Sequence, residues 1–351
     1  MEKLGFRPNE ADTTVFFHFK GDKVEIIGWY IDDELVVTSC AKSMECVVKD
    51  IGGSFDIQDL SKPDHLLGIK ITCDRDLGMI HILQPSFINT IACRFEITSG
   101  RAVSSPMDLS MDLHTSTDID SAVDMPYTSL IGSINYCAIS MWPDITFATN
   151  KCTQFASRPN LSHWEAAKWI VCYLLNTKEY GITYKEKGNG VEVYAHNLAG
   201  FTDMDFAGNT NNHKSTTGWV FTFNGAPISW ASKKQSLITC SSMEAKLVAG
   251  SIASAEGIWL IRLKRDFRHN FTPIPLFTDN QSFIAFTKGD ANNARTKHID
   301  THYHYTCKQV NVGIINLDYI PTANNPADIL TKPLSPRKHA NLLNTLGVRY
   351  I

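Results

Sequence analysis

The sequence lacks several features that would assign it to a particular class of protein. No window approaches about 18 continuous apolar residues, so no membrane-spanning helix is expected. The first six residues contain no apolar stretch of the signal-peptide kind, so we expect no secretory signal. The nine cysteines are scattered without a Cys-x-x-Cys pair. This argues against a zinc site or a disulfide framework and fits a reducing interior.

The sequence also has no large excess of charge of either sign. The formal net charge is -3, so no overall field would attract nucleic acid. Any contact with nucleic acid must therefore use local patches, such as Lys233-Lys234 or the segment 295–298 (Arg-Thr-Lys-His). Apolar residues make up 43% and charged residues 20% of the 351-residue chain, which is typical of a globular protein. That length suggests roughly two domains of about 150 residues each.

The first half of the chain combines expected strands with expected helices. Two strand-like segments, 24–30 and 35–37, are separated by the acidic pair Asp32-Asp33 and predict a hairpin. Segments 66–71 and 79–83 predict a second hairpin, and 98–126 reads as an irregular connection. Two helices are expected in 127–181, the second with a capping box of Ser162 and Glu165. The segment 185–190 is a candidate domain boundary.

From residue 191 the pattern predicts strands, a helix over 242–265, a strand at 274–278, helices, a strand at 314–320 and a mostly helical end over 326–346. Asn224-Gly225 between two apolar segments is a strong hairpin signal. The order of elements predicts a mixed sheet with helices on its faces, which is an α/β (α+β) fold.

Four acidic residues stand at the ends of these expected elements: Asp203, Glu244, Asp279 and Asp328. Taken singly, each has an ordinary explanation as a turn, a helix cap or compensation of a helix dipole. Taken together, they predict carboxylates aimed at one shared point. Such a cluster of hard oxygen ligands suits two Mg²⁺ (or Mn²⁺) ions held about 4 Å apart.

The same region resembles the ribonuclease H domain of copia-type retrotransposon polyproteins. The resemblance is carried by the segments 203–208 (Asp-Met-Asp-Phe-Ala-Gly), 215–221, 228–235, 241–245 (Ser-Ser-Met-Glu-Ala), 278–282, 295–300 and 327–334 (Ala-Asp-Ile-Leu-Thr-Lys-Pro-Leu). It implies that the four acids bind the catalytic metal ions. We also expect nucleic-acid contacts from Lys233, Lys234, Asn280, Gln281, Arg295, Lys297 and His298. One departure from the family pattern is Lys246, where an acid is common.

The N-terminal part resembles the C-terminal part of a copia-type reverse transcriptase. Here Tyr30-Ile31-Asp32-Asp33 would be the polymerase turn, with Asp32 and Asp33 as metal ligands and Tyr30 at the nucleic acid. Leu67 and Gly68, in 67–71, would hold the primer end. The resemblance implies three regions: polymerase palm hairpins and thumb at 1–110, a helical connection at 111–189, and a ribonuclease H-like five-stranded mixed sheet with flanking helices at 190–351.

The resemblance implies that a third polymerase carboxylate and the fingers would precede Met1. We therefore expect that this chain alone does not polymerise DNA. The expected activity is hydrolysis of the RNA strand of RNA–DNA hybrids, in cytoplasmic virus-like particles or in the nucleus. Expected partners are that hybrid, an RNA template with a DNA primer, and an N-terminal polymerase fragment supplied in trans, but no membrane.

Two alternatives stay open. One is a catalytically inactive remnant of a truncated retroelement that at most binds nucleic acid, and the other is a structure-selective nuclease on the same fold.

Overall fold

The structure is a computed structural model. It describes residues 1–98, 102–111, 113–114, 125–185, 198–206, 208, 214–236, 241–267, 273–288 and 300–351, and for residues 300–303 only the backbone. The chain divides into two compact units, 1–66 with 255–272, and 67–254 with 273–351. No helix among these described residues is long and apolar enough to cross a membrane.

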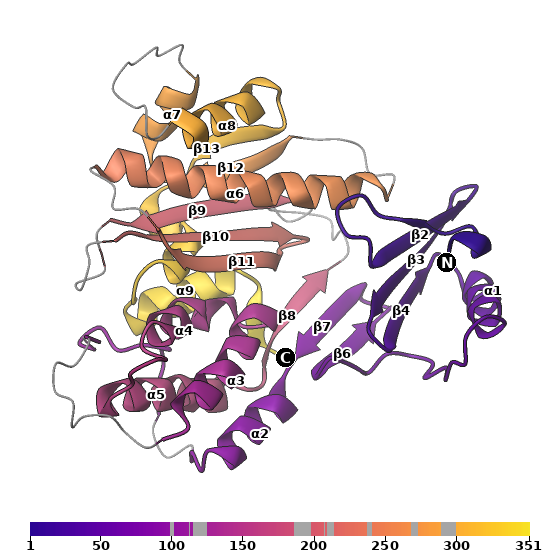
Figure 1. Ribbon diagram of the computed structural model, residues 1–351, viewed down its shortest axis with the longest axis horizontal. Coiled ribbons are helices and arrows are strands. Elements are labelled where there is room, and N and C mark those ends of the chain that lie inside the picture. The colour runs from indigo at the N-terminus through magenta and orange to yellow at the C-terminus, as the bar shows by residue number, and fades with distance from the viewer. Residues whose placement is uncertain are drawn as a thin grey trace. The chain divides into compact units, whose positions relative to one another are not determined.

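The first unit is a four-stranded antiparallel sheet with one covering helix (Figure 1). Its elements are η1 (Glu2–Leu4), β1 (Arg7–Pro8), β2 (Val15–Lys20), β3 (Lys23–Tyr30), β4 (Asp33–Thr38), α1 (Ala41–Gly52) and β5 (His65–Leu66). Val47 and Ile51 of α1 are buried against Ile27 of β3 and Phe6. The predicted hairpin around Asp32-Asp33 is confirmed, since Tyr30 pairs with Asp33.

The second unit begins with elements that the sequence predicted in part. They are β6 (Ile69–Asp74), β7 (Met79–Leu83), α2 (Pro85–Arg94), α3 (Tyr127–Ser140), η3 (Pro143–Ile145), α4 (Thr146–Thr153), α5 (Leu161–Thr177) and β8 (Tyr180–Lys185). The second predicted hairpin is confirmed by the antiparallel pairing of β6 and β7. Within residues 98–126, the described positions form no helix or strand, and the boundary at 185–190 falls largely outside the described residues.

The predicted capping box at α5 is wrong. The N-cap is Asn160, whose side chain accepts a hydrogen bond from the backbone N–H of His163 at 3.0 Å. The Nδ1 of His163 in turn accepts from the backbone N–H of Asn160 at 3.0 Å. Imidazole can therefore replace the glutamate of the usual capping box. Glu165 instead forms an ion pair with Lys168.

The C-terminal part of the second unit forms the predicted mixed sheet with flanking helices. Its elements are β9 (Ala199–Asp205), β10 (Thr216–Phe223), β11 (Ala226–Lys234), α6 (Ser242–Arg265), β12 (Ile274–Thr278), α7 (Gln281–Lys288), α8 (Asp300–Asn311), β13 (Ile315–Tyr319), η4 (Thr322–Asn324), η5 (Pro326–Leu330), α9 (Pro336–Thr345) and β14 (Val348–Tyr350). The strand order is β11-β10-β9-β12-β13, with β12 parallel to both of its neighbours. Asn224 and Gly225 both have positive φ, as the predicted tight turn between β10 and β11 requires.

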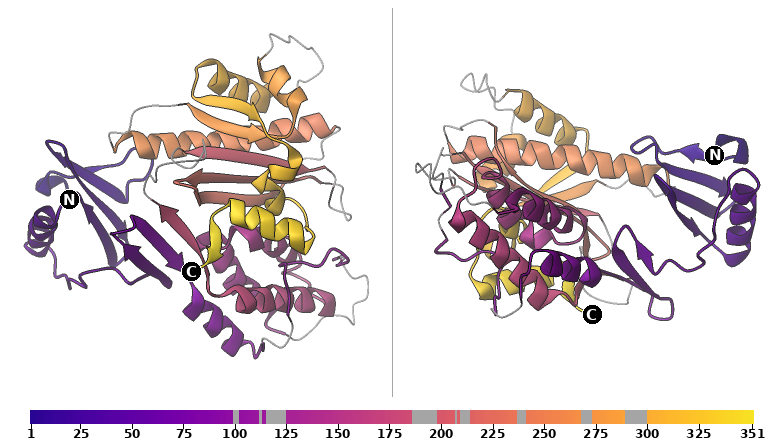
Figure 2. Two further views of the ribbon diagram at one scale, coloured as in Figure 1. Left: turned by 180° about the vertical axis from the view of Figure 1, so that it is seen from behind. Right: turned by 60° about the horizontal axis from the view of Figure 1, so that its bottom comes forward.

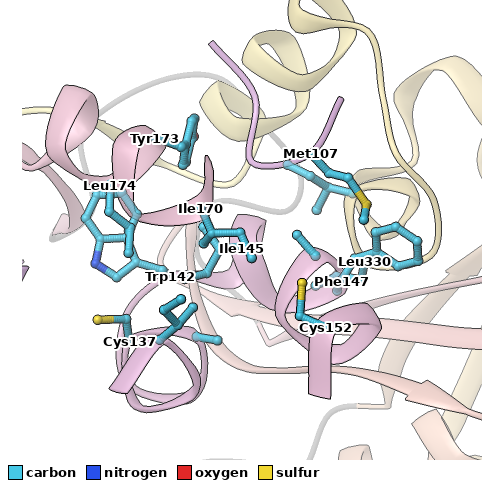
Figure 3. Packing of buried hydrophobic residues seen from close by; sticks show 14 of the residues in the cluster. Met107, Cys137, Trp142, Ile145, Phe147, Cys152, Ile170, Tyr173, Leu174 and Leu330 are labelled. Carbon is cyan, nitrogen blue, oxygen red and sulfur yellow. The ribbon is translucent and has the colours of Figure 1, made fainter. Parts of the chain in front are cut away.

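The two faces of this sheet are covered by different parts of the chain (Figures 1 and 2). On one face Met204 packs against Ala245 and Ala249 of α6. On the other face Phe201 joins a large core that includes η5, α9 and the helices α2 to α5. Figure 3 shows part of this core, where Leu330 of η5 lies near Phe147 of α4. Because α2 to α5 and the sheet share one core, the region from 190 onward is not packed as a separate domain.

The pairing of β8 with β14 was not predicted from the sequence. Residues 348–350 pair with 180–182 in an antiparallel ladder, and β8 also pairs with β7. Gly181 is needed at the centre of this ladder, since a Cβ there would lie 2.4 Å from the carbonyl oxygen of Ile82. The C-terminal strand therefore completes a sheet begun more than two hundred residues earlier.

Candidate active site

The register of two neighbouring parallel strands aligns Asp203 with Asp279. Phe201 of β9 pairs with Phe277 of β12, and their rings are stacked with centroids 5.2 Å apart. Asp203 and Asp279 each follow two residues later. Asp203 shares the face of β9 that carries Phe201, and Asp279 directly follows Thr278, the last residue of β12, so both aspartates lie toward the same edge of the sheet. The prediction that the carboxylate stands at the end of its element is confirmed for Asp279, whereas Asp203 lies inside β9, two residues before its end.

Asp328 reaches this face because η5 is fixed to β9. The side-chain oxygen of Asn325 accepts from the backbone N–H of Ala327 at 3.1 Å, and its amide nitrogen donates to the carbonyl of Thr202 at 3.1 Å. Gly218 of β10, paired with Asp203, leaves room for η5 to pack directly on the sheet. Asp328 is fully buried and Asp203 is 4% exposed.

One hydroxyl donor and two lysines surround this pair of carboxylates. The hydroxyl of Thr331 donates to Oδ2 of Asp203 at 2.7 Å. The Nζ of Lys332 lies 3.3 Å from Oδ2 of Asp203 and 2.9 Å from Oδ1 of Asp328. The Nζ of Lys338 contacts Oδ2 of Asp328. Thr331 and Lys332 are not among the residues predicted from the sequence, although the segment 327–334 contains both.

The two carboxyl groups affect each other's protonation. Burial raises the pKa of Asp203 to about 6, and the neighbouring Asp328 raises it as well, while Lys332 and Thr331 act in the opposite direction. Burial also tends to raise the pKa of Asp328. Hydrogen bonds involving Asp203, Lys338 and Lys332 outweigh that effect and hold this pKa below its ordinary value. Since two adjacent carboxylates are difficult to ionise together, the pair favours a nearby cation.

The other two predicted ligands are held differently. Oδ1 of Asp279 forms an ion pair with Lys246 of α6 at 2.9 Å, and its Oδ2 accepts from the hydroxyl of Thr322 at 2.9 Å. Glu244 is half-buried in the first turn of α6, where its backbone N–H donates to the hydroxyl of Ser241 at 3.1 Å. Lys246, a departure from the family pattern, is therefore a direct partner of a predicted metal ligand.

The carboxylate oxygens of Asp203 and Asp328 fit a divalent cation in chemistry, because Mg²⁺ and Mn²⁺ prefer such hard donors. Across the described residues, however, no group of three or more His, Cys, Asp or Glu side chains lies close enough to hold a metal ion. Lysine ammonium groups instead supply positive charge to Asp203, Asp279 and Asp328. Convergence of all four acids on one metal site stays a prediction.

The predicted nucleic-acid contacts are distributed over both faces of the sheet. Lys233 and Lys234 are consecutive residues of β11 and so point to opposite faces. The Nζ of Lys233 lies over the ring of Trp219, 5.1 Å from its centroid. Asn280 caps α7 by accepting from the backbone N–H of Phe283 at 3.2 Å. Gln281 begins α7, whereas Arg295, Lys297 and His298 lie outside the described residues.

The predicted polymerase turn lies in the first unit. Asp32 and Asp33 are exposed, and Tyr30 is 56% exposed. Ile31 has φ of 54°, an unusual value for a β-branched residue, and its carbonyl accepts from the indole of Trp29 at 2.8 Å. Backbone strain of this kind is often found at functional sites.

The predicted primer-holding residues lie in the second unit. Leu67 and Gly68 have φ of 52° and 73° and form a tight turn before β6. The hydroxyl of Tyr136 donates to the carbonyl of Leu67 at 2.5 Å. The turn is thus held by α3, and contact with a primer stays a prediction.

Comparison with known proteins gives matches along the whole chain. A family model described as "Reverse transcriptase (RNA-dependent DNA polymerase)" matches residues 1–109. A Pol polyprotein of transposon TNT 1-94 from Nicotiana tabacum is 33% identical over 99% of this chain and 26% of its own length. A Pol polyprotein of transposon RE1 from Arabidopsis thaliana is 29% identical over 98% of this chain and 23% of its own length. The chain thus spans about a quarter of the length of these curated relatives.

Solved structures give more distant similarities. Ribonuclease H1 from Halobacterium salinarum is 18% identical, with a TM-score of 0.29, over 38% of this chain and 93% of that chain. A foamy viral protease-reverse transcriptase in complex with double-stranded DNA is 14% identical, with a TM-score of 0.43, over 84% of this chain and 55% of that chain. The sequence matches decide the family: this chain belongs to the copia-type retrotransposon Pol polyproteins.

Proposed function

We propose that this chain is a metal-dependent ribonuclease H that hydrolyses the RNA strand of RNA–DNA hybrids. The proposal rests mainly on the buried Asp203–Asp328 pair, with Asp279 directly after the adjacent parallel strand β12. The mixed sheet and the copia-type family membership are consistent with it.

In this proposal the four acids together bind the divalent cations, and Asp203 lies at the centre of the ligand set. When bound, Mg²⁺ polarises the scissile phosphate and lowers the pKa of the attacking water. Thr331 and Lys332 stabilise the ionised form of Asp203, which is the form that binds a cation. Selectivity for RNA would come from the 2′-hydroxyls and the groove shape of the hybrid rather than from its base sequence.

The test is Mg²⁺-dependent cleavage of a labelled RNA–DNA hybrid by the full chain, with double-stranded RNA and double-stranded DNA as controls. The full chain is required because the sheet and the helices α2 to α5 share one core. We expect cleavage of the hybrid alone, and its loss in Asp203→Asn. Asp76→Asn makes the same change of charge at an exposed position outside the site and is expected to cleave normally.

Two outcomes would contradict the proposal. Cleavage that persists in Asp203→Asn would place the chemistry elsewhere. A chain that is folded by circular dichroism but inactive with both Mg²⁺ and Mn²⁺ would support the second candidate function, an inactive remnant that binds nucleic acid. That alternative is favoured by the lysines that already neutralise Asp279 and Asp328. Equal cleavage of double-stranded RNA would instead favour a structure-selective nuclease.

We further propose that the chain alone does not extend a primer. Asp32 and Asp33 form an acidic pair in the β3–β4 turn, and no third acid joins them among the described residues. Since two-metal chemistry depends on a complete ligand set, a pair is insufficient. Robust extension of a DNA primer on an RNA template by the purified chain would refute this.

A further inference from the structure

Lysines from two distant segments gather at the edge strand β11. Lys234 is its last residue, and its Nζ donates to the side-chain oxygen of Gln154, just after α4, at 2.9 Å. Lys214 precedes β10, and its Nζ donates to the carbonyl of Ser236, just after β11, at 2.5 Å. Lys151, on α4, is the third member. We call Lys151, Lys214 and Lys234 the edge lysine cluster.

The position of Lys151 follows from helix geometry. Asn150 donates from its side chain to the carbonyl of Ser232 in β11, and Gln154 accepts from Lys234, so both face this strand. Residues three and four apart lie on the same side of a helix. Lys151, three residues before Gln154 and adjacent to Asn150, therefore lies beside the end of β11.

The charges of the cluster act on one another. Burial lowers the pKa of Lys234, and the positive charges of Lys151 and Lys214 lower it further. All three lysines are only half exposed, so water compensates their mutual repulsion less well than at an open surface. A polyanion bound at this place would offset that repulsion.

The cluster lies on the same face of the sheet as the proposed active site. Thr216 of β10 pairs with Asp205 on one side and with Lys234 on the other. Directly paired residues project to the same face, and so does Asp203, two residues before Asp205. Two strand spacings separate Asp205 from Lys234 by about 10 Å. Measured along the axis of a duplex, this distance corresponds to roughly three base-pair steps of about 3.4 Å each.

We propose that the edge lysine cluster binds the sugar–phosphate backbone of the nucleic acid within a few base-pair steps of the Asp203–Asp328 pair. Lysine acts on phosphate as a point charge, so the contact contributes affinity and alignment without reading base sequence. Lys233 lies on the opposite face and is not part of this site. The inference rests on the proposed function for its choice of ligand, although it concerns binding and requires no cleavage.

The test measures binding of the full chain to a fluorescent RNA–DNA hybrid in EDTA, by anisotropy, across a series of salt concentrations. Each phosphate contact contributes about 0.9 to the slope of log K against log salt concentration. We expect Lys151→Gln, Lys214→Gln and Lys234→Gln each to reduce the slope by about 0.9, and the triple variant by about 2.7. Circular dichroism and melting curves establish that each variant is folded.

Lys185→Gln is the matched control, because it removes the same charge from an exposed residue of β8 that lies outside the cluster. It is expected to leave the slope unchanged. An unchanged slope in the folded triple variant, or an equal loss in Lys185→Gln and Lys234→Gln, would overturn the proposal. A reduced slope from a chain that cleaves nothing would support the binding site and refute the proposed nuclease activity. Failure of the binding proposal can therefore be told apart from failure of the nuclease proposal.

Discussion

Replacement of Gly218 by alanine tests whether close packing of η5 on the sheet positions the carboxylate pair. A Cβ at residue 218 would lie 2.7 Å from both the Cβ of Leu330 and the Cγ2 of Thr331. It would also lie 3.2 Å from the carbonyl oxygen of Ala327. These atoms belong to η5 and to the residue after it, so the added methyl group must push this segment away from β10.

The size of the effect follows from these distances. Carbon atoms in normal contact are about 3.5–4.0 Å apart, so the segment must move by about 1 Å. Overpacking of this kind costs about 1–3 kcal/mol of unfolding free energy. The same movement separates Asp328 and Thr331 from Asp203, and a misplacement of about 1 Å at a reacting site reduces a rate about 100-fold.

The assay combines initial rates of Mg²⁺-dependent hybrid cleavage at saturating substrate with urea unfolding. We expect Gly218→Ala to be slower by about 100-fold and less stable by about 1–3 kcal/mol. Gly132→Ala is the control, since Gly132 is an exposed residue of α3 and nothing lies within 4 Å of a Cβ built there. It should gain up to about 1 kcal/mol through helix propensity and cleave normally. Wild-type rate and stability in Gly218→Ala would refute the reasoning.

Three further predictions concern groups around the site. Lys332→Met removes a positive charge that lowers the pKa of Asp203, so the acid limb of the pH–rate profile for hybrid cleavage should move above about 6. An unmoved acid limb would count against Asp203 as the group that titrates there. Tyr173→Phe leaves buried Asp144 without its 2.5 Å hydrogen bond and should cost about 1–3 kcal/mol in urea unfolding, whereas an unchanged midpoint would contradict this. Burial lowers the pKa of His339 below its ordinary 6.5, so below that pH the unfolded chain binds a proton that the native state does not. Wild-type stability should therefore fall more steeply below pH 6.5 than that of His339→Gln, and parallel curves would refute it.

Local chemistry let the sequence predict much of the fold. Asn224-Gly225 specifies a tight turn because both residues tolerate positive φ, and the structure has them at 51° and 73°. The strands at 274–278 and 314–320 and the helix at 242–265 were also recognisable from composition and periodicity, and all three are present. These elements depend on neighbours in sequence, so no tertiary information is needed to identify them.

The sequence also located the acids of the candidate site but not their partners. Asp203 and Asp328 were identifiable because each lies within a motif of the family that the sequence resembles. Lys332 forms ion pairs with both residues, and Lys246 forms one with Asp279. These contacts exist only because the folded chain brings the lysine and aspartate side chains close together. A charge pattern alone does not indicate which carboxylate a lysine contacts.

Tertiary structure decided which surfaces come together. In sequence Lys233 and Lys234 form one basic pair, but strand alternation sends them to opposite faces of the sheet. Only the packing of α4 on β11 brings Lys151 and Gln154 to Lys234, from about eighty residues earlier in the chain. The sequence by itself thus determined the elements, the family and the four acids, because these depend on local pattern. The single core, the pairing of β14 with β8 and the edge lysine cluster depend on contacts between distant residues, which only the folded chain specifies.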